Sequence, residues 1–177
     1  RAIWEVFEKG SRALGITCGA DKGDIKLSVS GPVIGEIAAR LSGGYMSGWT
    51  YPYASGRDVT KGALRIAVGL PPDLPERDMG FVSAERAFIS IPGTIAGYSG
   101  LREAERIKGV KNVFVLKTPG SAVEFPTNNV KKCGNIISQE KTREEAVKSA
   151  EKAVGIIVPH LVPGDARTRE FLFSQNK

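Results

Sequence analysis

The sequence predicts an α+β fold in two pieces, and three observations support this class. Stretches with apolar residues at helical spacing are interspersed with stretches in which apolar and polar residues alternate, as they do in half-buried strands. A proline-rich segment at residues 71–80 separates residues 1–70 from residues 81–177 and predicts a linker between two domains. Hydrophobic residues make up 41% of the 177 residues and charged residues 25%, which is typical of a globular protein and excludes a collagen-like or disordered chain.

The first piece begins with a helix and a hairpin. Apolar residues recur at helical spacing up to about Leu14, so we expect the first helix to end there. Residues 25–29 and 33–37 each have the pattern of a strand, and Ser30-Gly-Pro between them is typical of a turn. These features predict an antiparallel hairpin over residues 24–38.

A glycine-rich stretch with four aromatic residues follows the hairpin. Residues 41–57 fit neither the helical nor the strand period, and they predict a long loop of functional importance. The aromatic side chains of this loop either line a substrate pocket or pack between the two pieces of the chain. Asp58 is placed to cap a helix that runs to about Val68.

The second piece combines short strands with two helices. Thr142 and Glu145 form a capping box, which predicts the start of a long helix. The polar, weakly patterned residues from Pro163 onward predict a tail. The sequence further predicts a helix at residues 100–108 and strands at residues 85–91, 94–96, 112–116 and 134–139.

Charge and cysteine content restrict the class of protein. The 25 basic and 19 acidic residues give a net charge of +6, but the basic residues are spread along the chain, so a nucleic acid partner is not expected. Cys18 and Cys133 have no metal-ligand spacing and suggest two buried thiols in a reducing, cytoplasmic compartment. No apolar run approaches the length of about 18 residues that a membrane span requires. Because the chain begins with Arg1 inside a helical pattern, we expect a fragment, or a processed or split polypeptide.

Two carboxylates of the hairpin are the best candidates for chemistry. The midpoint between Asp24 and Glu36 falls at the turn, so the two acids are expected opposite each other, with Cα atoms about 4.5–5.5 Å apart. Two hard oxygen ligands at this separation suit Mg²⁺, which also binds water and substrate phosphates. Arg40 lies four residues further on and is a candidate phosphate ligand. The alternative is an ordinary exposed hairpin with charges at its end. His160 is the only histidine, which excludes a histidine-rich metal site.

The spacing Asp24-x11-Glu36-Ile-Ala-Ala-Arg40 resembles the metal-binding signature of the ATP-grasp superfamily. In that signature an acid precedes, by about twelve residues, a strand that ends in Glu-x-Asn-x-Arg. The segment at residues 54–70 also resembles the family's outline, in which a loop leads into a helix that ends in Leu-Gly. Residues 80–160 resemble, more loosely, the small C-terminal domain of biotin carboxylase, carbamoyl-phosphate synthetase and glycinamide ribonucleotide synthetase.

The resemblance implies a function for each of these residues. Asp24 and Glu36 would bind Mg²⁺ (or Mn²⁺), and Arg40 would act in catalysis on the transferred phosphoryl group. Arg40, Gly43 and Gly44 would contact the ATP. The family activates a small carboxylate substrate with ATP to an acyl-phosphate, which an amine or another nucleophile then attacks, and ADP and phosphate are released.

The resemblance also implies a partner. In the family, the adenine pocket and the phosphate-binding lysines precede the metal strands, whereas only 23 residues precede Asp24 here. We therefore expect an N-terminal ATP-grasp lobe or a partner chain, and a homo-oligomer is a further option. Ala38 occupies the position of the family's asparagine ligand, so a non-catalytic binding or assembly module derived from the ATP-grasp fold is the alternative function.

Overall fold

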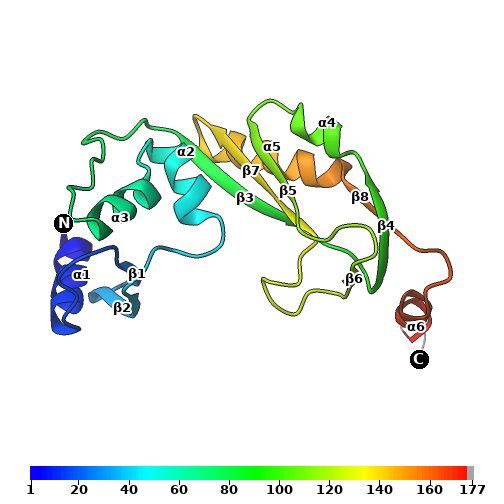
Figure 1. Cartoon of the computed structure of the whole chain (residues 1–177), viewed down its shortest axis with the longest axis horizontal. Coiled ribbons are helices and arrows are strands. Elements are labelled where there is room, and N and C mark those ends of the chain that lie inside the picture. The colour runs from blue at the N-terminus through cyan, green and yellow to red at the C-terminus, as the bar shows by residue number, and fades with distance from the viewer. Residues whose placement is uncertain (175–177) are drawn as a thin grey trace. The chain divides into compact units, whose positions relative to one another are not determined.

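The computed structural model describes residues 1–174, which form two compact units with a boundary between Met79 and Gly80 (Figure 1). This boundary lies at the end of the segment 71–80, which the sequence suggests as a linker. Both units combine helices with antiparallel strands, which confirms the predicted α+β class. None of the helices within residues 1–174 is long and apolar enough to cross a membrane.

Unit 1 is built from one hairpin, three α-helices and one π-helix. The first helix, the hairpin and the helix capped by Asp58 are confirmed, and the Asp58 carboxylate accepts a hydrogen bond of 2.8 Å from the backbone N–H of Lys61. Helix α1 packs closely on the hairpin, because a Cβ atom at Gly10 would lie only 2.5 Å from the Ile37 side chain. The elements of unit 1 are α1 (Ala2–Ala13), β1 (Lys22–Ser28), β2 (Gly31–Ala38), the π-helix η1 (Met46–Thr50), α2 (Tyr51–Ser55) and α3 (Val59–Ala67).

The hairpin register contains one irregularity that matters for the site. Ser28 pairs with Gly31 beside the turn, whereas Asp24 pairs with Glu36, because Gly35 is an extra residue in β2. A β-bulge of this kind changes the side of the sheet on which the following side chains lie. Without the bulge, Asp24 would lie opposite Gly35, and Glu36 would lie on the other face of the hairpin.

The prediction of a long loop at residues 41–57 is wrong. This stretch contains η1 and α2, which follow each other directly. Pro52 is the second residue of α2, next to the junction with η1. The rings of Tyr45 and Trp49 pack edge to face with centroids 5.3 Å apart. Aromatic packing one turn apart therefore supports a helical stretch whose glycine content concealed its period.

Unit 2 contains two three-stranded antiparallel sheets, with the strand orders β3-β7-β5 and β6-β4-β8. The strands expected at residues 85–91, 94–96, 112–116 and 134–139 are present with shifted ends, and two short strands were not expected. The capping box is also present, since Thr142 accepts a hydrogen bond from the N–H of Glu145. The elements are β3 (Val82–Phe88), β4 (Gly93–Ser99), α4 (Leu101–Glu105), β5 (Val110–Val115), β6 (Ala122–Val123), β7 (Gly134–Glu140), α5 (Arg143–Ile156), β8 (Val158–Leu161) and α6 (Ala166–Ser174).

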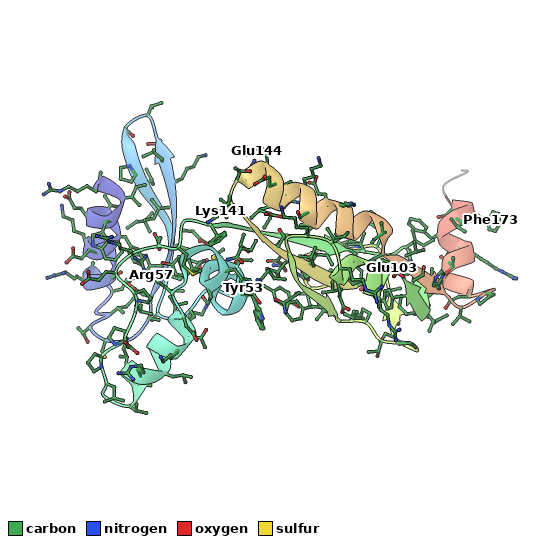
Figure 2. The ribbon with its side chains drawn as sticks, turned by 90° about the horizontal axis from the view of Figure 1, so that it is seen from above. Tyr53, Arg57, Glu103, Lys141, Glu144 and Phe173 are labelled. Carbon is green, nitrogen blue, oxygen red and sulfur yellow. The ribbon has the colours of Figure 1, made fainter. Side chains whose placement is uncertain are left out.

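The hydrophobic core lies entirely in unit 2. Helix α5 contributes three alanines with no exposed surface, whose small side chains let the helix lie close to β3 and β7. The buried core cluster consists of Ala84, Phe88, Ile95, Ala104, Val123, Cys133, Ile136, Ala146, Ala150, Ala153 and Ile157. Side chains such as Glu103 on α4 and Glu144 on α5 belong to the outer surface (Figure 2).

The prediction of a tail from Pro163 is wrong for the described residues, because these include α6. The Asp165 carboxylate accepts a 2.6 Å hydrogen bond from the Thr94 hydroxyl and pairs with Arg167 at 3.1 Å. These hydrogen bonds, first from Arg167 and then from Thr94, lower the pKa of Asp165 far below its ordinary value. The helix is thus attached to β4 mainly by polar contacts, which leave no hydrophobic period in the sequence. Residues 175–177 of the predicted tail lie outside the described residues.

The expectation of two buried thiols is half wrong. Cys133 is buried in the core, and burial raises the pKa of its thiol, but Cys18 is exposed. Cys18 lies in the connection between α1 and β1, where no core exists to cover it.

Candidate functional site

The carboxylates of Asp24 and Glu36 meet at the open end of the hairpin. The two residues are direct partners across β1 and β2, as the sequence predicts. Their side chains are 62% and 54% exposed, so both carboxylates are accessible to a ligand from solvent. The predicted pairing of the two acids is therefore confirmed. Their role as metal ligands stays a prediction.

Lys22 connects the two carboxylates. Its Nζ atom lies 2.6 Å from Oδ2 of Asp24 and 3.0 Å from Oε1 of Glu36. The hydrogen bond to Asp24, and then that to Glu36, raises the pKa of Lys22 above its ordinary value. The sequence pattern did not predict a role for Lys22. The signal that could have indicated one is its position two residues before Asp24, since residues two apart on a strand share a face.

Arg40 lies beside the same pair. Its guanidinium approaches Oε1 of Glu36 to 4.0 Å and donates a hydrogen bond of 3.0 Å to the backbone carbonyl of Leu41. The Arg40 side chain is 58% exposed, so most of its donors are available to an anion. Two cations and two carboxylates therefore share one end of the hairpin.

Gly43 and Gly44 follow directly and leave their backbone accessible. A Cβ atom built on either residue would meet no other atom within 4 Å. Gly44 has a φ of +64°, a conformation that glycine adopts without strain. This backbone is open to a ligand, although no contact links these glycines to the carboxylate pair.

The donor set fits a Mg²⁺ ion that is held partly by substrate. Within residues 1–174, no group of three or more histidine, cysteine, aspartate or glutamate side chains is arranged to hold a metal ion. Two carboxylates are nevertheless sufficient for Mg²⁺, which retains water and binds substrate phosphates. Ala38 supplies no ligand, so the protein's share of the coordination comes from Asp24 and Glu36.

An apolar cavity of about 500 Å³ lies within unit 1 next to this cluster. Lys22 and Gly23 of β1 belong to its lining, and so do Trp4 and Phe7 of α1. Among the four aromatic residues at 45–53, Tyr51 lines the cavity. An apolar cavity with a charged rim is a suitable shape for a small ligand with a polar head group.

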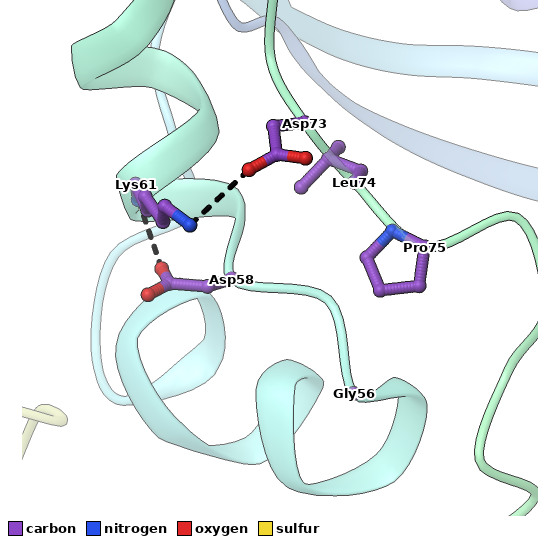
Figure 3. Close-up of a pocket in the computed structure, with 6 residues that line it drawn as sticks. All are labelled: Gly56, Asp58, Lys61, Asp73, Leu74 and Pro75. Carbon is purple, nitrogen blue, oxygen red and sulfur yellow. Dashed lines mark hydrogen bonds and ion pairs between the residues drawn. The ribbon is translucent and has the colours of Figure 1, made fainter.

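A second cavity, of about 370 Å³, is polar and its charges are satisfied internally (Figure 3). The Lys61 ammonium lies 3.3 Å from the Asp73 carboxylate, while Asp58 caps α3. Arg57 fastens the same segment by hydrogen bonds to the backbone carbonyls of Pro75 and Glu76. These contacts attach residues 71–79 to the rest of unit 1. We therefore assign this cavity a structural role.

Known proteins resemble this chain in sequence and in fold. Residues 87–162 match the family model "L-amino acid ligase C-terminal domain 2". Over 66 residues the chain is 39% identical to carnosine synthase 1 of Gallus gallus, a match that covers 37% of the chain and 7% of that protein. Among solved structures, L-amino acid ligase from Bacillus licheniformis is similar with a TM-score of 0.76 and 19% identity, over 91% of the chain and 40% of that structure.

The chain has the fold of the ATP-grasp ligases. Phosphoribosylglycinamide synthetase from Anaerococcus prevotii is similar with a TM-score of 0.77 and 16% identity, over 88% of the chain and 40% of that structure. The biotin carboxylase domain of 2-oxoglutarate carboxylase from Hydrogenobacter thermophilus, in complex with magnesium ADP, is similar with a TM-score of 0.57 and 17% identity. That match covers 88% of the chain and 35% of the structure.

The structural matches confirm the fold that the ATP-grasp resemblance implies. The chain spans less than half the length of each of these relatives. The family model covers most of unit 2, whereas the metal motif lies in unit 1.

Proposed function

We propose that the chain supplies the magnesium-binding carboxylates of an ATP-dependent, ADP-forming ligase. The observation that carries this proposal is the pairing of Asp24 with Glu36, with Arg40 beside them, in a chain with the ATP-grasp fold. In the reaction, a substrate carboxylate oxygen forms a bond to the γ-phosphorus of ATP while ADP leaves. An amine nitrogen then attacks the acyl carbon, phosphate leaves, and the amine loses a proton to solvent.

The residues of the site divide this work by charge. Asp24 and Glu36 are the ligands for Mg²⁺, which when bound neutralises phosphate charge. Arg40 extends the positive charge next to Glu36 and is placed to orient the transferred phosphoryl group. Gly43 and Gly44 have backbone N–H groups with no side chain to obstruct an approaching phosphate.

The substrates that we propose are L-amino acids, one as the carboxylate and one as the amine. Support comes from the family model at residues 87–162, whose name specifies L-amino acid ligases, and from the similarity to carnosine synthase. The cavity of about 500 Å³ beside Lys22 has the volume and apolar lining for one amino acid side chain.

An N-terminal ATP-grasp lobe is the partner that we propose for unit 1. The buried residues in the described range 1–79 are Ser11, Ser47, Ser55 and Gly62, so no hydrophobic side chain of this unit is fully covered. A two-stranded hairpin is only marginally stable without an apolar surface packed against it. The apolar side chains that remain more than 45% exposed are Ile3, Trp4, Leu14, Leu27, Val29, Val33, Met46, Leu64, Val68, Leu70 and Met79.

A non-catalytic ATP-grasp-derived module is the second candidate. Ala38 in the position of the family's asparagine favours it, since the metal site then has only two protein ligands. The pairing of both carboxylates with Lys22 favours it too, because the charge of the acids is already compensated.

Calorimetric titration with Mg²⁺-ATP separates the two candidates. The chain should be titrated alone and mixed with an N-terminal ATP-grasp lobe, in the wild-type form and as Glu36→Gln. We expect binding that requires Mg²⁺ and is lost in Glu36→Gln, while the control Glu103→Gln, an exposed residue on α4 (Figure 2), binds as the wild type does. Binding that is unchanged in Glu36→Gln would contradict the proposed site, and no binding under either condition would favour the non-catalytic module.

A further inference from the structure

Lys22 occupies the position between the carboxylates that a metal ion would need. Its ammonium contacts Oδ2 of Asp24 at 2.6 Å and Oε1 of Glu36 at 3.0 Å, so one cation bridges both acids. Its side chain is only 19% exposed, whereas the two carboxylates are more than half exposed. Lys22 thus bridges two acids that are both more exposed than Lys22 itself. Its partly buried side chain distinguishes this ion pair from pairs between flexible side chains on the surface.

The charge of the two carboxylates is already balanced by neighbouring side chains. The two carboxylates carry a charge of −2, and Lys22 with Arg40 already supplies +2 at the same end of the hairpin. A divalent cation that binds Oδ2 of Asp24 and Oε1 of Glu36 competes with the lysine for these oxygens. Such a cation breaks two charge-assisted hydrogen bonds, and a cation that binds the other carboxylate oxygens is repelled by the nearby ammonium.

The position of the Lys22 side chain restricts where the displaced ammonium can go. Lys22 belongs to the lining of the apolar cavity of about 500 Å³, together with Gly23 and Phe7. A lysine stem placed along apolar surface keeps its charged end at the polar rim of that surface. The apolar lining therefore gives the Lys22 stem a surface to lie on next to the carboxylates.

We propose that Lys22 is a displaceable internal counter-cation of the carboxylate pair. It holds Asp24 and Glu36 together in the absence of a divalent cation, and it lowers the affinity of the pair for that cation until one displaces it. This role rests on the proposed function, because it takes the pair as the metal site. Lys22 is a positioning residue in this account, since it acts through the two carboxylates.

The test is Mn²⁺ binding to the chain, followed by electron paramagnetic resonance of the free ion at fixed, low ionic strength. Lys22→Met removes the charge and keeps an unbranched stem of similar length. Lys26→Met is the matched control, because Lys26 lies two residues beyond Asp24 on the same face of β1, is exposed, and undergoes the same change of charge. Glu36→Gln removes one proposed ligand, and Lys22→Arg retains the positive charge.

We expect Lys22→Met to lower the Kd for Mn²⁺ about fivefold or more, as the loss of two competing ion pairs requires. Lys26→Met and Lys22→Arg should each remain within about twofold of the wild type, apart from general screening effects. An unchanged or raised Kd in Lys22→Met, with Mn²⁺ binding that still depends on Glu36, would overturn the role of Lys22 and leave the proposed function intact. Binding that does not depend on Glu36, or no binding to any form, would overturn the metal site itself.

A thermal measurement keeps the proposal testable if Lys22→Met loosens the hairpin. Both tryptophans of the chain, Trp4 and Trp49, lie in unit 1, so their fluorescence follows this unit. Without Lys22 the two facing carboxylates repel each other, and we expect a lower Tm that MgCl₂ restores. The wild type and Lys26→Met should gain less from MgCl₂. An equal gain in all three proteins would contradict the proposal.

Discussion

The two units bury opposite kinds of residue. Unit 2 encloses a cluster of eleven buried hydrophobic residues, six of which have no exposed surface. Unit 1 buries three serines and a glycine, and it leaves Trp4 and Leu27 each 68% exposed. Burial of apolar surface is the main favourable term in folding, so unit 2 has the larger stability of its own.

The buried core and the candidate site therefore lie in different parts of the chain. The candidate metal ligands, Arg40 and the larger cavity all belong to unit 1, which has the weaker core. A binding site needs exposed polar groups and an accessible cavity, and both reduce the apolar surface that the same residues can bury. The partner lobe that we propose for unit 1 would cover its exposed apolar side chains, whereas unit 2 already has a covered core.

Separate production of the two units should have the largest effect. We expect residues 80–177 to unfold cooperatively when heated, because the whole core cluster lies within them. Residues 1–79 should show a broad transition and bind a dye for exposed apolar surface. Circular dichroism and dye fluorescence measure these two properties. A cooperative transition in residues 1–79 would show that this unit needs no partner lobe.

Truncation of a buried side chain in unit 2 should cost more stability than truncation of an exposed side chain in unit 1. Ile136→Ala removes a side chain with no exposed surface, and we expect it to lower the free energy of unfolding of unit 2 by about 2–5 kcal/mol. Val33→Ala in β2 alters a side chain that is 52% exposed and should change stability by less than about 0.5 kcal/mol. Urea titrations measure both values, and equal losses would contradict the contrast between the units.

Asp165→Asn tests the polar attachment of α6 through pH. Because the native state lowers the pKa of Asp165, the ionised carboxylate stabilises the fold above the ordinary carboxyl pKa of about 4. This contribution is lost as the pH falls through and below that range. The variant should therefore have a lower Tm than the wild type at pH 7, and the difference between the two Tm values should begin to shrink as the pH falls below about 4. A difference in Tm that does not depend on pH would contradict this explanation.

The smallest effect that we predict concerns the cap of α5. Thr142→Ala removes the hydroxyl that accepts a hydrogen bond from the N–H of Glu145, at a cost of about 1 kcal/mol in unfolding free energy. The control Lys148→Ala, an exposed position within the same helix, should leave stability almost unchanged. Equal effects of the two substitutions would show that the capping box contributes nothing specific.

Local signals in the sequence predict part of the fold well. The caps at Asp58 and Thr142 mark helix starts because each depends on contacts within three residues. The position of the hairpin turn predicts that Asp24 lies opposite Glu36. The structure has this pairing because the bulge at Gly35 shifts the register by one residue between the turn and Asp24. Strands β6 and β8 have two and four residues, too few for a recognisable period.

Contacts between distant residues explain what the sequence could not predict. Helix α6 depends on the Thr94–Asp165 hydrogen bond, which joins residues 71 positions apart. Lys22 meets Glu36 only once the hairpin has formed, and the strand predicted from residue 25 onward did not include it. The cavity beside Lys22 is formed by α1, the hairpin and α3 together, so no single pattern in the sequence reports it.

The central claim is that the carboxylate pair of unit 1 serves an amino acid ligase. The most direct test is the release of ADP from Mg²⁺-ATP in the presence of pairs of L-amino acids, with the chain completed by an N-terminal ATP-grasp lobe. We expect amino-acid-dependent ADP release that Glu36→Gln abolishes and Glu103→Gln does not, while the unfolding of unit 2 is the same in all three proteins. ADP release that persists in Glu36→Gln would show that the carboxylate pair does not serve this reaction.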